Sequence, residues 1–388
     1  MANKPRIRFK GFTEDWEQRK LNDFGIATGG TSIESEFVDG GTYKVISIGS
    51  YSEESVYNDQ GLRVNKTDKT KFRILNKDDL TMILNDKTAS GNIIGRVLLI
   101  DQDNTYVYNQ RTERIEVDTK NFLPMFLYHM LNAPEQRKYI VKASQGNTQI
   151  YVNWSTINNI DYMIPQLLLE QEKIANLFSL INKDITLHQC KLEKLKLTKK
   201  ALLQKLFPKN GKHIPEIRFK GFTDAWEQRK LSDILKVNSG KDYKHLDQGN
   251  IPVYGTGGYM LSVNESLSNI DAIGIGRKGT IDKPQYLKAP FWTVDTLFYL
   301  TALDKHSILF LYYLMQLIPW KKFDESTGVP SLSKTTIDNI SGFVPSNFQE
   351  EELISALFNQ LDKSITLHQR KLERLQEVKK GLLQKMFV

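Results

Sequence analysis

Residues Pro5–Phe24, PRIRFKGFTEDWEQRKLNDF, recur almost unchanged as Pro215–Ile234, PEIRFKGFTDAWEQRKLSDI, with 15 of 20 residues identical. A second block, Ile181–Phe207, returns as Leu361–Phe387 with 17 of 27 residues identical. The period is close to 200 residues, far longer than that of a solenoid. The pattern therefore indicates duplication of a whole structural unit.

The segments between the repeated blocks are largely unrelated to each other. The first blocks are offset by 210 positions and the second by 180, so the insert Gly25–Pro165 is 30 residues longer than the insert Leu235–Pro345. Constant frames thus enclose variable inserts. The central junction between the two units reads like the C-terminus joined to the N-terminus, and we expect the chain ends to lie close together in a circular arrangement.

Each C-terminal block carries the apolar pattern of a coiled coil, with steps of three and four residues. Pro165 and Pro345 precede the two predicted helices, and the spacing of Ser346 and Gln349 predicts a capping box. Because both units have the same order of lobe and helix, a two-fold-like pairing is antiparallel. A helix over residues 166–207 would span on the order of 60 Å and act as a spacer. The residues expected to pair the helices are Ile181, Ile185, His188, Leu192, Leu195, Leu361, Ile365, His368, Leu372 and Leu375.

Polar residues interrupt this seam in both copies. His188 and His368 allow two interpretations, a metal or proton site and a polar position that sets the register, and we favour the second. Lys199 and Lys379 are expected to extend to the rim of the seam. Trp16 and Trp226 lie in the repeated frame, which favours a place in the core.

The repeat predicts an α+β fold in which two mixed α/β lobes are separated by an antiparallel coiled coil of two long helices, in a pseudo-two-fold circular arrangement. The expected lobes are residues 1–165 and 208–345. The expected spacer helices are residues 166–207 and 346–388.

Composition favours a folded protein with a polyanionic partner. Of 388 residues, 53 are Lys or Arg and 45 are Asp or Glu, which gives a net charge of +8 and a pI near 9.1. The single cysteine, Cys190, excludes a disulfide framework and a thiolate zinc site. No apolar run approaches the roughly 20 residues of a membrane span, and we identify no targeting segment, so the cytoplasm is expected.

Motifs of catalysis are missing from the sequence. No two prolines are adjacent, which argues against the Pro-Pro-aromatic loop of an amino-methyltransferase acting on DNA. No proline precedes an aspartate, so the start of a common nuclease motif is absent. The glycine clusters at Gly255–Gly258 and Gly274–Gly279 lack the spacing of a phosphate-binding loop. We expect neither a catalytic residue nor a metal site in this chain.

The duplicated IRFKGFT…WEQRKL openings and ITLHQ-x-KLE helices, set around two unlike inserts, resemble the specificity subunit of type I restriction-modification systems. The resemblance implies that each lobe is a target-recognition domain reading half of a split sequence in double-stranded DNA, and that the helices set the gap and dock two methyltransferase subunits. It also implies that restriction subunits join the complex. Adenine methylation with S-adenosylmethionine, and DNA cleavage with ATP and Mg, would belong to these partners.

Polar and glycine-containing stretches after apolar strands are similar to the loops of that family's recognition domains. Base readout needs amide, hydroxyl and cationic side chains presented on such loops. The predicted DNA-binding residues of the first lobe are Lys87, Thr88, Ser90, Asn92, Arg96, Gln145, Asn147, Gln149 and Tyr151. Those of the second lobe are Tyr254, Thr256, Arg277, Lys278, Thr280, Ser326, Ser331 and Lys334.

Other classes of protein fit some of these features. A stand-alone repressor would read an asymmetric operator with the same two lobes and need no enzyme partner. A fragment fused elsewhere to nuclease and methyltransferase domains, or a coiled-coil scaffold that binds no DNA, are further alternatives. Two unlike inserts in matching frames argue against a pure scaffold.

Overall fold

The repeated opening segment forms the same strand in both halves of the chain. The computed structural model describes residues 4–209, 211–303 and 305–388. Strand β1 (Glu17–Lys20) pairs antiparallel with β11 (Asp161–Ile164), and β12 (Glu227–Lys230) pairs in the equivalent register with β20 (Ser341–Val344). Each pairing places the start of the repeat beside the strand that precedes a long helix.

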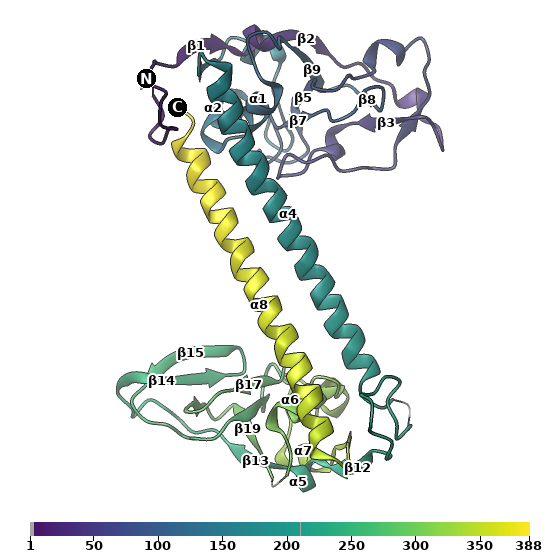
Figure 1. Ribbon diagram of the computed structural model, residues 1–388, viewed down its shortest axis with the longest axis vertical. Helices are drawn as coiled ribbons and strands as arrows, with labels where there is room; N and C mark the ends of the chain where they lie inside the picture. Colours follow the sequence, from purple (N-terminus) through teal and green to yellow (C-terminus); the bar gives the residue numbers. More distant parts are fainter. Residues whose placement is uncertain (1–3, 210, 304) are drawn as a thin grey trace. The chain divides into compact units, whose positions relative to one another are not determined.

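The chain divides into two compact units, and both long helices contribute to both units. Unit 1 comprises Met1–His188 with Lys371–Val388, and unit 2 comprises Gln189–Arg370. Helix α4 (Leu168–Lys205) begins in unit 1 and ends in unit 2, whereas α8 (Phe348–Lys385) begins in unit 2 and ends in unit 1 (Figure 1). Within each unit the start of one helix and the end of the other share one core. We call the part of unit 1 before α4 lobe 1, and the part of unit 2 between α4 and α8 lobe 2.

Lobe 1 is built mainly of short strands, with three short helices near its end. Its remaining strands are β2 (Gly25–Gly29), β3 (Tyr43–Ile46), β4 (Arg63–Val64), β5 (Leu80–Ile83), β6 (Asn85–Asp86), β7 (Val97–Leu99), β8 (Tyr106–Tyr108), β9 (Thr112–Val117) and β10 (Ile150–Tyr151). Its α-helices are α1 (Pro124–Leu131), α2 (Pro134–Ala143) and α3 (Trp154–Ile157). Its 3-10 turns are Leu21–Phe24, Glu34–Glu36, Ile48–Ser50 and Lys71–Arg73.

Lobe 2 has the same kind of composition. Its remaining strands are β13 (Leu235–Ser239), β14 (Gln248–Gly255), β15 (Gly258–Val263), β16 (Ala272–Gly276), β17 (Gln285–Leu287), β18 (Trp292–Thr293) and β19 (Leu297–Ala302). Its helices are α5 (Leu231–Ile234), α6 (Ile308–Met315) and α7 (Lys334–Asn339), with a 3-10 turn at Trp320–Phe323.

The two lobes share a sheet topology although their sequences differ. The four-stranded order β2-β9-β5-β7 in lobe 1 corresponds to β13-β19-β16-β17 in lobe 2. The three-stranded order β4-β3-β8 corresponds to β15-β14-β18. In both sheets the central strand, β3 or β14, pairs parallel with the last strand, β8 or β18. The expected α+β class, with two domains joined by long helices, is confirmed.

An aromatic cluster joins lobe, helix start and helix end in each unit. In unit 1, Phe387 stacks on Phe178 at 5.6 Å between ring centroids and lies 5.9 Å from Phe126. In unit 2, the equivalent rings of Phe207, Phe358 and Phe310 lie 6.3 and 5.4 Å apart. Trp16 and Trp226 pack edge-on against Phe126 and Phe310, and both indoles are buried, as predicted for core residues.

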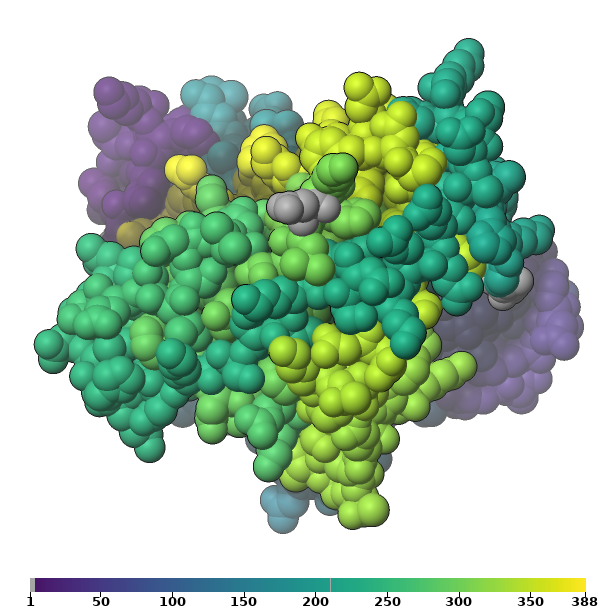
Figure 2. Space-filling view, turned by 90° about the horizontal axis from the view of Figure 1, so that it is seen from below, coloured from purple at the N-terminus to yellow at the C-terminus, as the bar shows by residue number. Residues whose placement is uncertain are grey.

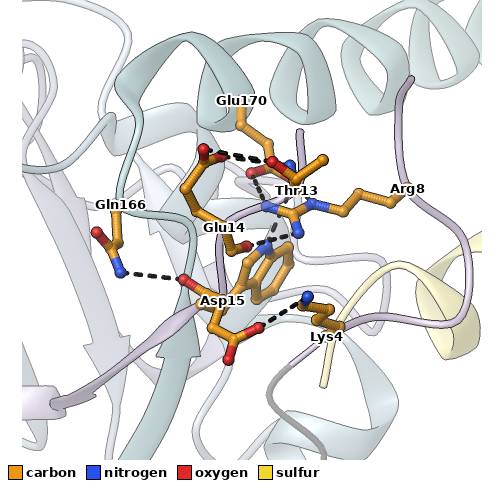
Figure 3. Close-up of polar contacts among 8 residues, drawn as sticks. Lys4, Arg8, Thr13, Glu14, Asp15, Gln166 and Glu170 are labelled. Atoms are coloured by element: carbon orange, nitrogen blue, oxygen red, sulfur yellow. Dashed lines mark hydrogen bonds and ion pairs between the residues drawn. The ribbon is translucent and has the colours of Figure 1, made fainter. Parts of the chain in front are cut away.

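A buried ion pair ties each opening segment to its helix. Arg8 donates two hydrogen bonds to the Glu170 carboxylate, which also accepts a bond from the Trp16 indole at 3.3 Å (Figure 3). Arg218 and Glu350 form the same pair in unit 2. On the surface of unit 2, the teal segment that joins α4 to β12 lies beside the start of α8 (Figure 2).

The two chain ends meet in unit 1, as the repeat predicted. The Ile7 backbone N–H donates to the Lys385 carbonyl at 2.9 Å, and Ile217 donates to Lys205 at the same distance in unit 2. The first contact joins the two ends of the chain, and the second joins residues of one continuous segment. The two units thus share this backbone contact.

The start of α8 differs from the predicted capping box. The Asn347 side chain accepts a hydrogen bond from the Gln349 backbone N–H at 2.8 Å, and α8 begins at Phe348. The prediction of Ser346 as the cap is wrong, because asparagine caps a helix as well as serine and Asn347 lies one residue nearer.

The long helices expose one face and cover another. The ten residues predicted to pair the helices are all buried or half-buried. Lys199 does not extend to the rim as predicted, because its Nζ lies 2.6 Å from Asp362 Oδ1 and its side chain is only 18% exposed. Across the described residues, no helix is long and apolar enough to cross a membrane.

Candidate nucleic-acid interface

A buried carboxylate shapes the first predicted loop of lobe 1, residues 87–92. Asp86 accepts hydrogen bonds from the Thr88 backbone and hydroxyl and from the Ile93 backbone, each at 2.9 Å. Burial alone would raise the pKa of Asp86, but the bonds from Ile93 and Thr88 outweigh it and lower the pKa. The loop closes over this side chain and leaves Lys87, Ser90 and Asn92 exposed.

The second predicted loop of lobe 1, residues 145–151, lies against the first. Strand β10 pairs with β6 through Ile150 opposite Asp86. Gln145 and Tyr151 exchange two backbone hydrogen bonds of 2.9 Å, which hold the loop as a narrow hairpin. The side chains of Gln145, Asn147, Gln149 and Tyr151 are exposed. The structure therefore brings both predicted loops of lobe 1 together.

Arg96 serves the base of the first loop rather than its exposed side. Its Nε donates to the Asn92 carbonyl at 2.7 Å, and its Nη1 donates to Ser55 Oγ at 3.0 Å. Burial lowers its pKa. Asn92 itself donates from its side chain to Glu53 at 2.8 Å. The sequence around residues 87–96 did not predict that the Arg96 side chain points toward the base of the loop.

Lobe 2 brings its predicted loops together in the same manner. Residues 277–280 follow β16, and the segment 326–334 pairs with them: Leu332 N–H donates to the Arg277 carbonyl at 3.0 Å, and Gly279 N–H donates to Pro330 at 2.8 Å. Asp324 Oδ1 accepts from the backbone and hydroxyl of Ser326 and from the Ser331 backbone. These bonds, led by that of Ser331, lower the pKa of Asp324.

The side chains of this second cluster line a hollow of about 380 Å³. Arg277, Lys278, Ser331 and Lys334 contribute to its wall, and the Arg277 guanidinium lies 5.8 Å from the centre of the Phe298 ring. Arg277 and Lys278 are exposed, whereas Thr280 is half-buried. The hollow offers a cationic and hydroxyl-bearing surface.

Tyr254 and Thr256 approach this cluster from the end of β14. Gln285 Nε2 donates to the Thr256 carbonyl at 3.2 Å, and the Thr256 hydroxyl lies 3.7 Å from the position of a β-carbon on Gly279. Tyr254 is half-buried and lies 6.4 Å from Tyr259 between ring centroids. Thr256 thus adjoins the loop that carries Arg277, and Tyr254 lies on the β14–β15 hairpin.

A groove of about 830 Å³ lies beside the β14–β15 hairpin, which includes the stretch 254–259 singled out in the sequence. Lys244, Gln248, Tyr259 and Ser262 line it, and Tyr259 is 63% exposed. An exposed aromatic ring and a lysine in one groove suit contact with nucleic acid.

Both lobes therefore present amides, hydroxyls and cations on paired loops, which is the chemistry that reads base edges and contacts phosphates. Within the part of the chain that the structure describes, no group of three or more His, Cys, Asp or Glu is placed to hold a metal ion.

The sequence model of the type I restriction modification DNA specificity domain matches the chain twice, over residues 13–197 and 223–377. The chain belongs to this family. Each specificity-domain match runs from a repeated opening segment, through one lobe, into a long helix. The duplication and the family assignment thus define the same two units.

Three proteins named as parts of type I restriction systems are similar to this chain. The chain is 22% identical over 177 residues to the Type I restriction enzyme MjaVIII specificity subunit of Methanocaldococcus jannaschii, and the match covers 45% of this chain and 39% of that subunit. The type I restriction-modification S subunit of M. genitalium has a similar fold, with a TM-score of 0.74, 18% identity and 99% of both chains covered. A chain from a study of the assembly and conformational transition of the type I R-M system matches with a TM-score of 0.50 and 13% identity, over 96% of this chain and 97% of that one.

Proposed function

We propose that this chain is the DNA-recognition subunit of a type I restriction-modification complex, in which each lobe reads one half of a bipartite site. The observation that carries the proposal is the duplicated specificity domain, whose two lobes share a topology and differ in the loops they present. Unlike loops on like scaffolds suit two unlike half-sites.

The long helices would set the unread gap between half-sites and dock two methyltransferase subunits. Exposed leucines on the two helices include Leu180, Leu187 and Leu197 on α4 and Leu353 and Leu367 on α8. Methyltransferase subunits docked on the helices would cover such leucines. Half-sites read in this way lie about one or more helical turns, roughly 34 Å, apart on DNA.

The reactions would belong to the partners. Methyltransferase subunits would modify adenines with S-adenosylmethionine, and restriction subunits would use ATP and Mg to cleave DNA. This chain would act in the cytoplasm as a recognition subunit without catalytic residues, holding these subunits at the site.

Exchange of one lobe tests the proposal. Replacing Gly25–Pro165 with the insert of another family member should change one half of the methylated motif in genomic DNA and leave the other half unchanged. Inserting four residues, about one turn, into α4 should lengthen the gap only. A change in both halves, or in neither, would contradict modular recognition.

Co-purification separates this function from that of a repressor. A specificity subunit should co-purify with a methyltransferase, and no methylated motif should form without that methyltransferase. A chain that remains alone and binds one operator tightly would favour the repressor.

A further inference from the structure

The two units differ in one cluster of charged side chains that lies outside the predicted DNA-binding loops. In unit 2, Lys199 Nζ lies 2.6 Å from Asp362 Oδ1, and the Tyr313 hydroxyl donates to Asp362 Oδ2 at 2.9 Å. Lys199 also lies 5.3 Å from the centre of the Tyr313 ring. The Asp362 carboxylate of α8 thus contacts both α4 and lobe 2.

The equivalent positions in unit 1 lack that carboxylate. The repeat aligns Lys379 with Lys199 and Asn182 with Asp362. His129 of α1 takes the place of Tyr313 of α6, since it packs on Phe178 at 5.5 Å as Tyr313 packs on Phe358 at 4.8 Å. Lys379 is half-buried like Lys199, but the residue at the position of Asp362 is the uncharged Asn182.

Lys379 lines a cavity of about 440 Å³ in unit 1. The cavity is lined by four cations, Lys379, Lys380, Arg96 and Arg137, and by two acids, Glu53 and Glu54, so its formal charge is +2. Among the described residues, none of the four cations forms an ion pair within 4 Å. Arg137 Nη2 donates to the carbonyls of Gly91, Asn92 and Ile94, whereas its Nε is buried without a hydrogen-bond partner.

Burial without a counter-charge is unfavourable for all three inward-facing cations. It lowers the pKa of Lys379 and Arg96, and it lowers that of Arg137 to about 10. Burial, with the nearby Lys379, also lowers the pKa of His129 to about 3, so this ring is neutral at physiological pH. An anion that entered the cavity would relieve this cost.

We propose that this cavity binds a phosphate group, either inorganic phosphate or the terminal phosphate of a nucleotide, in the role that Asp362 has in unit 2. A phosphate dianion matches the formal charge of +2, and guanidinium groups bind phosphate oxygens in pairs. The Asn182 side chain in the wall supplies a neutral donor.

A bound phosphate would link lobe 1 to α8. Ser55, Arg96 and Arg137 belong to the lobe, whereas Lys379 belongs to the helix. Asp362 makes this link in unit 2, and the bound phosphate would make it in unit 1. Phosphate therefore stabilises unit 1 selectively.

Titration of the full-length chain with inorganic phosphate tests the site. Phosphate should raise the unfolding temperature by several degrees, and chloride at the same ionic strength should not. Asn182→Asp restores the carboxylate found in unit 2, so it should weaken phosphate binding at least about tenfold while the chain stays folded. Lys278→Ala, which removes a cation of the lobe 2 loops, should leave phosphate binding unchanged.

The outcomes separate the sources and can overturn the site. Equal affinity for inorganic phosphate and AMP identifies the free ion, and clearly tighter binding of AMP identifies a nucleotide. Binding that Asn182→Asp leaves intact, or that Lys278→Ala abolishes, would place the phosphate elsewhere and refute the proposal. The methylated motif of Asn182→Asp should stay that of the wild type, so failure here is distinct from failure of the recognition function.

Discussion

Arg8 and Glu170 are 162 residues apart in the chain, and they form a two-pronged ion pair with Nε–Oε1 and Nη2–Oε2 distances of 2.7 and 2.8 Å (Figure 3). The Glu170 side chain is 1% exposed and that of Arg8 is 13% exposed. The hydrogen bond with Glu170 is the main cause of the raised pKa of Arg8. This contact fixes the opening segment to the start of α4.

Arg8→Ala should lower the free energy of unfolding by about 3–5 kcal/mol, because it leaves the buried Glu170 carboxylate without its counter-charge. Urea denaturation of the full-length chain measures the change. The exposed pair Lys4–Asp15, at 3.0 Å, is the matched control, and Lys4→Ala should cost less than about 1 kcal/mol. Equal effects of the two substitutions would show that the Arg8 pair has no special role.

Asp86 and Asp324 organise the loops of the two lobes, so their substitutions should act on different half-sites. Asp86→Ala frees the Thr88 and Ile93 donors, and Asp324→Ala frees those of Ser326 and Ser331. Each substitution should weaken binding about tenfold to DNA that carries the half-site read by the same lobe. Competition with duplexes in which only one half-site is altered shows which half-site has lost affinity. Each variant is the control for the other. Loss at the opposite half-site would be inconsistent with separate lobes.

The two repeated blocks were sufficient to predict the frames, because the identical residues there make the contacts that both units share. Trp16 in the core and the meeting of the chain ends both follow from that identity. The common topology of the lobes was beyond reach, since unlike side chains satisfy the same strand order. The motif that contains Arg96 does not reveal that its guanidinium turns inward, because the hydroxyl it meets, Ser55, lies 41 residues away. The cap at Asn347 was missed because Ser346 fits the same local pattern.

Lys278 and Arg277 are adjacent and should have different effects on DNA binding. Lys278→Ala should weaken binding to all duplexes alike and reduce the slope of log K against log salt by about 1, as loss of one phosphate contact does. Arg277→Ala should cost about 1–3 kcal/mol and relax the preference at one base pair of the lobe 2 half-site. Binding to a panel of single-base variants at several salt concentrations measures both effects. If Lys278→Ala altered base preference while Arg277→Ala did not, the two roles would have to be exchanged.

Glu113 should make lobe 1 less stable as the pH rises. Its side chain lies on β9 and is 6% exposed, and burial raises its pKa from 4.5 to about 7, with Arg73 offsetting part of the effect. Because the folded state holds the proton more tightly than the unfolded state, this contribution to stability is complete below pH 4.5 and is lost as the pH rises through about 7. Glu113→Gln keeps the neutral shape, so its unfolding free energy should exceed that of the wild type above this range and match it at low pH. Denaturation curves across the range, with Glu116→Gln on the exposed face of the same strand as control, check the sign. Parallel pH profiles for wild type and Glu113→Gln would mean that the carboxyl reaches water in the folded chain.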